Sequence, residues 1–88
     1  MKTIWKYEIP IEEKFEISMP IMARILSVQN QQRVPQMWCL VDSDKPVKTR
    51  KFIIVGTGHE VMHGNLTYIG TFLVHGDMLV LHLFEIMD

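Results

Sequence analysis

The feature that most constrains this chain is a two-residue alternation of apolar and polar side chains, which recurs along the sequence. Three segments show it in the N-terminal third: Thr3–Ile9, Lys14–Ser18 and Met22–Gln29. Successive side chains of a β-strand point to opposite faces, so this period is typical of half-buried strands. No window of ten or more residues holds the 3.6-residue period of an amphipathic helix. The alternation therefore predicts a mainly β chain.

Turn-forming residues divide the rest of the chain into further short strands. These are predicted over Gln36–Val41, Val47–Val55, Leu66–His75 and Met78–Ile86. We expect turns at Asn30–Arg33, Asp42–Pro46 and Gly76–Asp77, and we expect Met19-Pro20 to end the second strand. The predicted fold class is all-β, a small antiparallel sandwich or partly closed barrel of about seven short strands with at most one short helical turn. Residues 1–88 are expected to form a single β domain.

Length and charge limit the classes of function that are open to the chain. Its 88 residues are too few for a multidomain enzyme, and 48% hydrophobic with 22% charged residues argues against disorder. A net charge of -1 gives no general attraction to nucleic acid or to an anionic membrane, and we expect neither as a partner. The single cysteine, Cys39, excludes an internal disulfide and is expected to pack as a small hydrophobic residue. Without a signal-peptide pattern, the chain is expected in a cytoplasm.

The last predicted strand is unusually apolar. Met78–Phe84 has hydrophobic residues on both faces and one histidine, His82, which is a pattern typical of a strand covered on two sides. In so short a chain the second cover could be another subunit, so we expect a homo-oligomer. His82 is expected to be a hydrogen-bonded core or interface histidine. The aromatic residues Trp5, Tyr7 and Trp38 are expected in the core rather than on a base-stacking surface.

One motif matches a zinc-peptidase signature. His59-Glu60-Val61-Met62-His63 has the H-E-x-x-H spacing, in which a helix places both imidazoles on one metal ion and the glutamate activates a bound water. Glycines flank the motif here and leave little more than one helical turn, in a predicted loop. A zinc-dependent hydrolase using His59, Glu60 and His63 is therefore only a minor alternative, and no cofactor is expected.

A second candidate site begins where the fifth strand ends. Gly56-Thr57-Gly58-His59 could expose backbone N–H groups to an anion, although it lacks the third glycine, lysine and following helix of nucleotide-binding loops. The alternative is a glycine-kinked exit from the strand. Lys45, Lys48, Arg50 and Lys51 form the main concentration of basic residues, which suits an anion site or the solvated face of an edge strand. We take Gly56, Thr57, Gly58, His59, Lys48 and Arg50 as candidate ligand-binding residues, and no residue as catalytic.

Several short elements together resemble a known family. They are Trp5-Lys6-Tyr7, Met19-Pro20 with Ile25-Leu26-Ser27-Val28, Trp38 with Val41-Asp42, Gly56-Thr57-Gly58-His59, Tyr68-Ile69-Gly70-Thr71-Phe72, and Leu79-Val80 with His82 and Phe84. Nearly the whole chain is similar to a family of small uncharacterised bacteriophage and prophage proteins. It departs from that pattern at Ile21-Met22, where a small residue is expected, and at Glu60–His63. The resemblance brings no catalytic residues with it.

The resemblance implies a phage gene product that acts in the host cytoplasm. We accordingly expect a small binding protein without catalytic activity, a homo-oligomer that engages a host factor. The alternative is sequestration of a small anionic, nucleotide-like ligand in a pocket between subunits.

Overall fold

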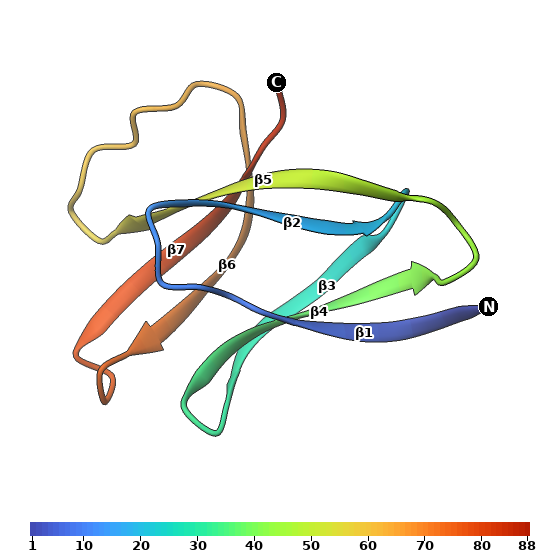
Figure 1. Cartoon of the computed structure of the whole chain (residues 1–88). Helices are drawn as coiled ribbons and strands as arrows, with labels where there is room; N and C mark the ends of the chain where they lie inside the picture. Colours follow the sequence, from blue (N-terminus) through green and yellow to red (C-terminus); the bar gives the residue numbers. More distant parts are fainter.

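Seven antiparallel strands form two sheets in the computed structural model, which describes all residues 1–88. The strands are β1 (Lys2–Glu8), β2 (Lys14–Pro20), β3 (Arg24–Gln31), β4 (Val34–Asp42), β5 (Val47–Gly56), β6 (Leu66–Val74) and β7 (Leu79–Ile86). Figure 1 shows the two sheets facing each other as an open sandwich, without closure into a barrel. The predicted all-β class and the strand number are confirmed, and no helical turn forms. No helix in the structure has the length and apolar character needed to span a membrane.

The smaller sheet has the order β1-β4-β3, with β4 in the centre. Met37, Cys39 and Val41 alternate along β4 and are fully or almost fully buried. They point toward the second sheet, as the two-residue period requires. Between them, Trp38 and Leu40 are half-buried on the outer face.

The larger sheet has the order β2-β5-β7-β6. β5 pairs with β2 from Val47 to Ile53 but with β7 only from Lys51 onward, so Val47–Arg50 has one open side. The basic segment was predicted to lie on a solvated edge strand. Only Val47–Arg50 has such an open edge, because the rest of β5 pairs with β7. Apolar burial begins at Phe52, where both neighbouring strands are present.

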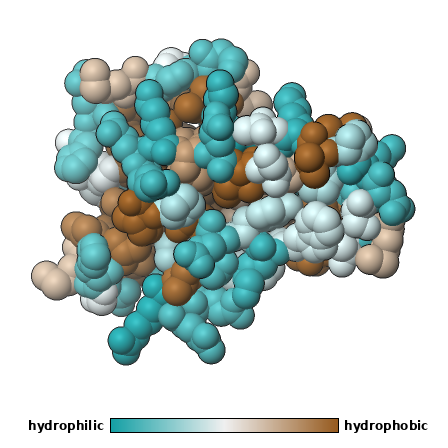
Figure 2. Space-filling model, viewed as in Figure 1, coloured by the Kyte–Doolittle hydropathy of each residue, from teal (hydrophilic) through white to brown (hydrophobic).

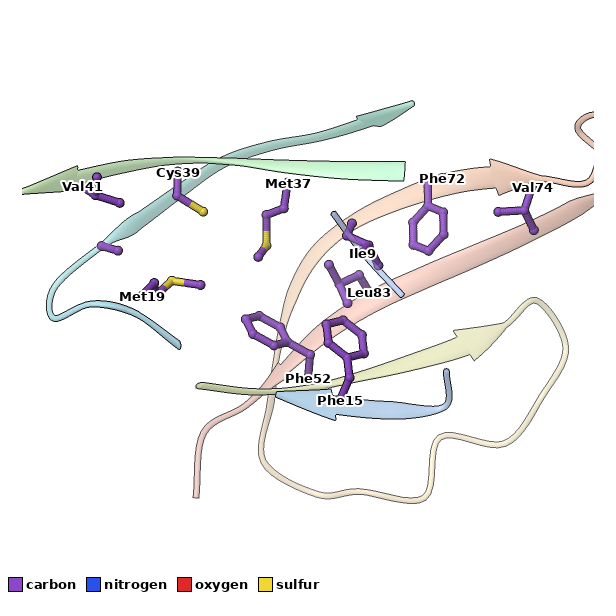
Figure 3. Close-up of a cluster of buried hydrophobic side chains, with 11 residues drawn as sticks. Ile9, Phe15, Met19, Met37, Cys39, Val41, Phe52, Phe72, Val74 and Leu83 are labelled. Carbon is purple, nitrogen blue, oxygen red and sulfur yellow. The ribbon is translucent and has the colours of Figure 1, made fainter. Parts of the chain in front are cut away.

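The core lies between the sheets and contains eleven residues. Phe15 of β2 and Phe52 of β5 stack with ring centroids 5.3 Å apart. Figure 3 shows Met37 and Cys39 pointing from the small sheet toward these rings. The cluster is completed by Ile9, Met19, Ala23, Val41, Phe72, Val74 and Leu83. Cys39 is fully buried, as the sequence predicts.

Two predicted strand boundaries are wrong. β2 continues through Met19 and Pro20, which pair with Lys48 and Val47. Proline is compatible with this position because β2 is an edge strand and the pairing ends there. The predicted loop between β3 and β4 shrinks to two turn residues, Gln32 and Arg33, both with positive φ. Positive φ at both central residues is the conformation of a type I′ hairpin turn, which lets the strands extend further than expected.

The final strand is covered by the second sheet on only one face. Leu83 and Glu85 are buried, whereas Phe84 and Ile86 on the outer face are half-buried and Leu79 and Val80 are exposed. Hydrophobic residues also reach the surface in several areas of the face in Figure 2. The total accessible surface is 5984 Å², against about 5,400 Å² for a typical monomer of this mass. The chain is therefore more open than its size requires.

Candidate functional site

The Gly-Thr-Gly-His element forms a tight turn at the end of β5. Gly56 is the last residue of the strand and pairs with Leu81. Gly58 has φ +85°, which L side chains rarely adopt, and His59 N–H donates a 3.1 Å hydrogen bond to the Gly56 carbonyl. The imidazole folds back over Gly56 so closely that a Cβ there would lie 2.9 Å from His59 Nδ1. Both glycines are thus explained by local geometry.

Beside this turn lies a groove of about 700 Å³, which we name the β5-end groove. One wall is the connection between β1 and β2, and the other is the loop between β5 and β6, drawn in yellow and orange in Figure 1. Its lining residues are Ile11, Glu12, Glu13 and Lys14 from the first wall, His59, Glu60, Met62 and His63 from the second, and Ile53, Ile54, Val55, Gly56 and Leu81 from the strands. The groove contains two of the six predicted ligand-binding residues, Gly56 and His59.

The charge of the groove is unfavourable for an anion. Three carboxylates, Glu12, Glu13 and Glu60, line it with a single lysine, Lys14. A phosphate-like group would meet net negative charge there, which repels it. Apolar side chains supply much of the remaining lining, and Ile11 and Met62 are 52% and 85% exposed. The groove therefore suits a binding partner that presents both apolar and positively charged side chains.

The two predicted basic residues lie in another place. Lys48 and Arg50 line a separate depression of about 530 Å³ together with Glu85 and Asp88. Arg50 and Gly56 are six residues apart along β5, which corresponds to about 20 Å. The structure does not bring the glycine turn and the basic residues into one site.

Arg50 is engaged inside the protein. Its Nε and Nη2 donate to the two carboxylate oxygens of Glu85, each at 2.6 Å, and its Nη1 donates to the Ala23 carbonyl at 2.7 Å. The side chains of Arg50 and Glu85 are only 21% and 9% exposed. The hydrogen bonds to Glu85 raise the pKa of the guanidinium above its already high value. Arg50 therefore ties β5 to β7 and to the segment before β3, and Lys48 is the exposed member of the pair.

The zinc motif is not formed in space. Residues 59–63 are not helical, so the i, i+4 spacing does not place the two imidazoles on one helical face. No group of three or more His, Cys, Asp or Glu side chains is arranged to hold a metal ion. His63 instead lies near the C-terminal residue, with its Nε2 3.7 Å from Asp88 Oδ1. The helix that the zinc-hydrolase match requires is therefore not formed at residues 59–63.

A hydrogen-bonded row on the outer face of the large sheet was not predicted from sequence. Both ring nitrogens of His82 are bonded: Nε2 to Thr57 Oγ1 at 2.7 Å and Nδ1 to Thr71 Oγ1 at 3.0 Å. Tyr68 OH extends the row to Thr71 Oγ1 at 2.6 Å. His82 is hydrogen-bonded, as expected, but on an outer face rather than in the core. Thr57 belongs to this row, and its hydrogen bond to His82 connects the start of the β5–β6 loop to β7.

The remaining side chains considered from the sequence are Cys39 and three aromatic residues. Burial raises the pKa of the Cys39 thiol to about 11, so it is a poor nucleophile. Tyr7 and Trp38 are half-buried, and Trp5 is 40% exposed, so the prediction of core aromatics is wrong for Trp5.

Comparison with protein families gives one result. A family model described as "Domain of unknown function (DUF7352)" matches residues 1–88. No curated protein and no solved structure matches the chain.

Proposed function

We propose that the chain, which belongs to the DUF7352 family, is a binding protein without catalytic activity that assembles with a second copy and engages another protein. The observation that carries this proposal is the β5-end groove, with its exposed apolar side chains and acidic margin. Exposed methionine is a common feature of surfaces that bind varied apolar partners, because its side chain is flexible and polarizable. Met62 provides such a side chain on the loop wall.

The partner segment is defined by the chemistry of the groove. Glu12, Glu13 and Glu60 favour lysine or arginine, and Ile11 and Met62 favour an apolar side chain between them. We therefore propose that the partner presents a short, basic and apolar segment. In this proposal the chain is phage-encoded and acts in the host cytoplasm, as the resemblance of its sequence elements implies, and the partner is a host protein.

Selection of a displayed peptide library on the pure protein tests the proposal. Enriched peptides are expected to combine lysine or arginine with large apolar residues, and to shift the NMR signals of the groove residues. Glu60→Lys should weaken binding of such a peptide about tenfold, because it removes an attraction and adds a repulsion. Glu16→Lys is the matched control, since Glu16 is an exposed carboxylate outside this groove. Enrichment of acidic peptides, or equal weakening by both variants, would contradict the proposal.

The alternative, a nucleotide-like ligand held between subunits, is favoured by one observation. Lys48 and Lys51 are exposed in the depression beside Arg50, and neither forms an ion pair. Such a ligand should raise the melting temperature, whereas inorganic salts at matched ionic strength should not. A flat response across a nucleotide panel would exclude this alternative and leave the protein-binding proposal unaffected.

A further inference from the structure

β1 has an uncovered edge. It lies at the margin of the small sheet, and β4 is the only strand that it contacts (Figure 1). Two large apolar residues in its middle are consequently exposed: Ile4 on the outer face at 56% and Trp5 on the inner face at 40%. Trp5 shares its face with buried Cys39, but no strand of the larger sheet lies opposite it.

The free backbone groups of β1 can be assigned from the bonds at its two ends. The carbonyl of Met1 accepts from Ser43 N–H, and Ile9 N–H donates to the Pro35 carbonyl, both at 2.9 Å. In an antiparallel pair, alternate residues direct both of their backbone groups to the same neighbour. Odd-numbered residues of β1 therefore bond to β4. The N–H and carbonyl groups of Lys2, Ile4, Lys6 and Glu8 point away from the sheet.

The other three sheet edges are less suitable for pairing. β3 and β6 both contain a bulge, at Ile25/Ser27 and at Tyr68/Gly70, and they pack against each other. Asn30 Nδ2 also donates to the Leu73 carbonyl across that side, at 2.7 Å. The third edge, β2, ends in Pro20, which has no N–H to donate. β1 is the one edge strand with a regular register, no proline and no contact with a strand of the other sheet.

The charges on β1 and the length of strand that can pair together favour one way of pairing it with a second copy. A twofold axis perpendicular to the sheet keeps the inner faces on the same side, so even-numbered residues must lie opposite even-numbered residues. With the axis at Ile4, Lys2 lies opposite Lys6, and with the axis at Lys6 that lysine faces itself. Both arrangements bring like charges together, which is unfavourable across a strand pair. An axis at Thr3 or at Tyr7 avoids like charges but pairs only three residues of each strand, whereas an axis at Trp5 pairs all seven. With the axis at Trp5, Lys2 lies opposite Glu8 of the second copy, twice over by symmetry.

We propose that β1 is a self-association edge, at which two copies pair antiparallel about Trp5 into one continuous six-stranded sheet. The even-numbered residues then exchange about eight backbone hydrogen bonds. Trp5 lies at a position where directly opposite side chains come closest, so the two indoles meet and lose exposure. The inference deepens the self-assembly part of the proposed function by placing the interface on β1 rather than on the final hairpin.

A charge-exchange experiment tests this register. Lys2→Glu or Glu8→Lys each places two pairs of like charges across the interface, and each should weaken the dimer at least about tenfold by sedimentation equilibrium. Mixing the two variants restores both attractions within a mixed dimer, so the mixture should associate about as tightly as the natural protein. The purification tag belongs at the C-terminus, because the Met1 amine is bonded to Asp42 and Asp44. Glu16→Lys, on the other sheet, should change nothing.

Ile4→Pro provides a second variant that does not depend on charge. The missing N–H is one that points away from β4, so the monomer keeps its hydrogen bonds to β4. The dimer loses two hydrogen bonds, one from each copy, and the proline rings obstruct the pairing. A folded monomer is expected by circular dichroism and sedimentation. If the natural protein is monomeric at millimolar concentration, or if the mixed variants stay monomeric, the inference is wrong. Peptide binding in the β5-end groove is measured separately, so its failure would leave this result standing.

Discussion

Arg50 owes its role to a partner far away in the sequence. Glu85 lies 35 positions later, and the two side chains form a bidentate ion pair between β5 and β7, neighbouring strands of the larger sheet. Arg50→Met would leave the Glu85 carboxylate with no opposite charge in a largely buried place. We expect a loss of about 2–4 kcal/mol in the free energy of unfolding, measured with urea.

Lys48→Met is the matched control for that substitution. Lys48 is an exposed cation two residues away on the same strand, and its replacement should change stability by less than about 0.5 kcal/mol. Equal effects of the two substitutions would contradict a structural role for Arg50. The sequence placed both residues in one basic run and could not distinguish them, because it does not show which residue reaches Glu85.

Because of Cys39, we expect the free energy of unfolding to change with pH in the alkaline range. Its thiol has a pKa of about 11 in the folded protein, because of burial, against 9.0 when unfolded. The folded state therefore favours the protonated thiol. The stabilisation of the folded state by the protonated thiol is fully present below pH 9 and is lost as the pH rises toward 11.

Comparison with Cys39→Ala isolates this effect, because the variant lacks the thiol and keeps every other ionisable group. The free energy of unfolding should fall more steeply between pH 9 and 11 in the natural protein than in the variant. If the free energies of unfolding of the two proteins fall equally with pH, Cys39 does not contribute to the pH dependence. Burial of this residue was predictable from its place in an alternating strand, although the size of the pKa shift was not.

At the scale of elements, the close approach of β3 and β6 depends on a glycine. A Cβ at Gly70 would lie 2.9 Å from Val28 Cβ, an atom fixed to the backbone of β3. Gly70→Ala should therefore force the two sheets apart and cost about 1–3 kcal/mol, measured by thermal or urea unfolding.

Two further variants test the cause of that loss. Val28→Ala in the Gly70→Ala background should restore part of the stability, because it removes the methyl groups beside the new Cβ. Gly64→Ala should be neutral, since nothing lies within 4 Å of its Cβ position. A Gly70→Ala protein as stable as the natural one would show that the sheets can shift without cost.

The alternation of side chains, together with the turn residues, predicted all seven strands. The turn at Gly76 also predicts the register of the last two strands. Pairing outward from that turn places Thr71 opposite His82, which is the observed register. The His82 row could therefore have been found in part from sequence. The bulge between Tyr68 and Gly70 was not predicted, although a glycine inside a strand often marks one. The non-helical conformation of residues 59–63 agrees with the loop predicted there.

At the scale of the whole molecule, sequence could not assign strands to sheets. Strand order depends on contacts between distant segments, such as those of β1 with β4 and of β2 with β5. That assignment leaves β1 with a free edge and separates Lys48 from Gly56. Several large apolar side chains are exposed in one copy, including Leu79 and Val80 of the final strand. The sequence directed the expectation of self-assembly to this final hairpin, whereas our proposal places it on the free edge of β1.

Hydrogen exchange at the β1 amides measures the free edge directly. In a dilute monomer, Trp5 and Tyr7 should be protected by β4, whereas Ile4 and Lys6 should exchange rapidly. At millimolar concentration the amides of Ile4 and Lys6 should become protected as well, while the exchange rates of the β7 amides stay unchanged. Rapid exchange at Ile4 and Lys6 at every concentration would contradict self-association through β1.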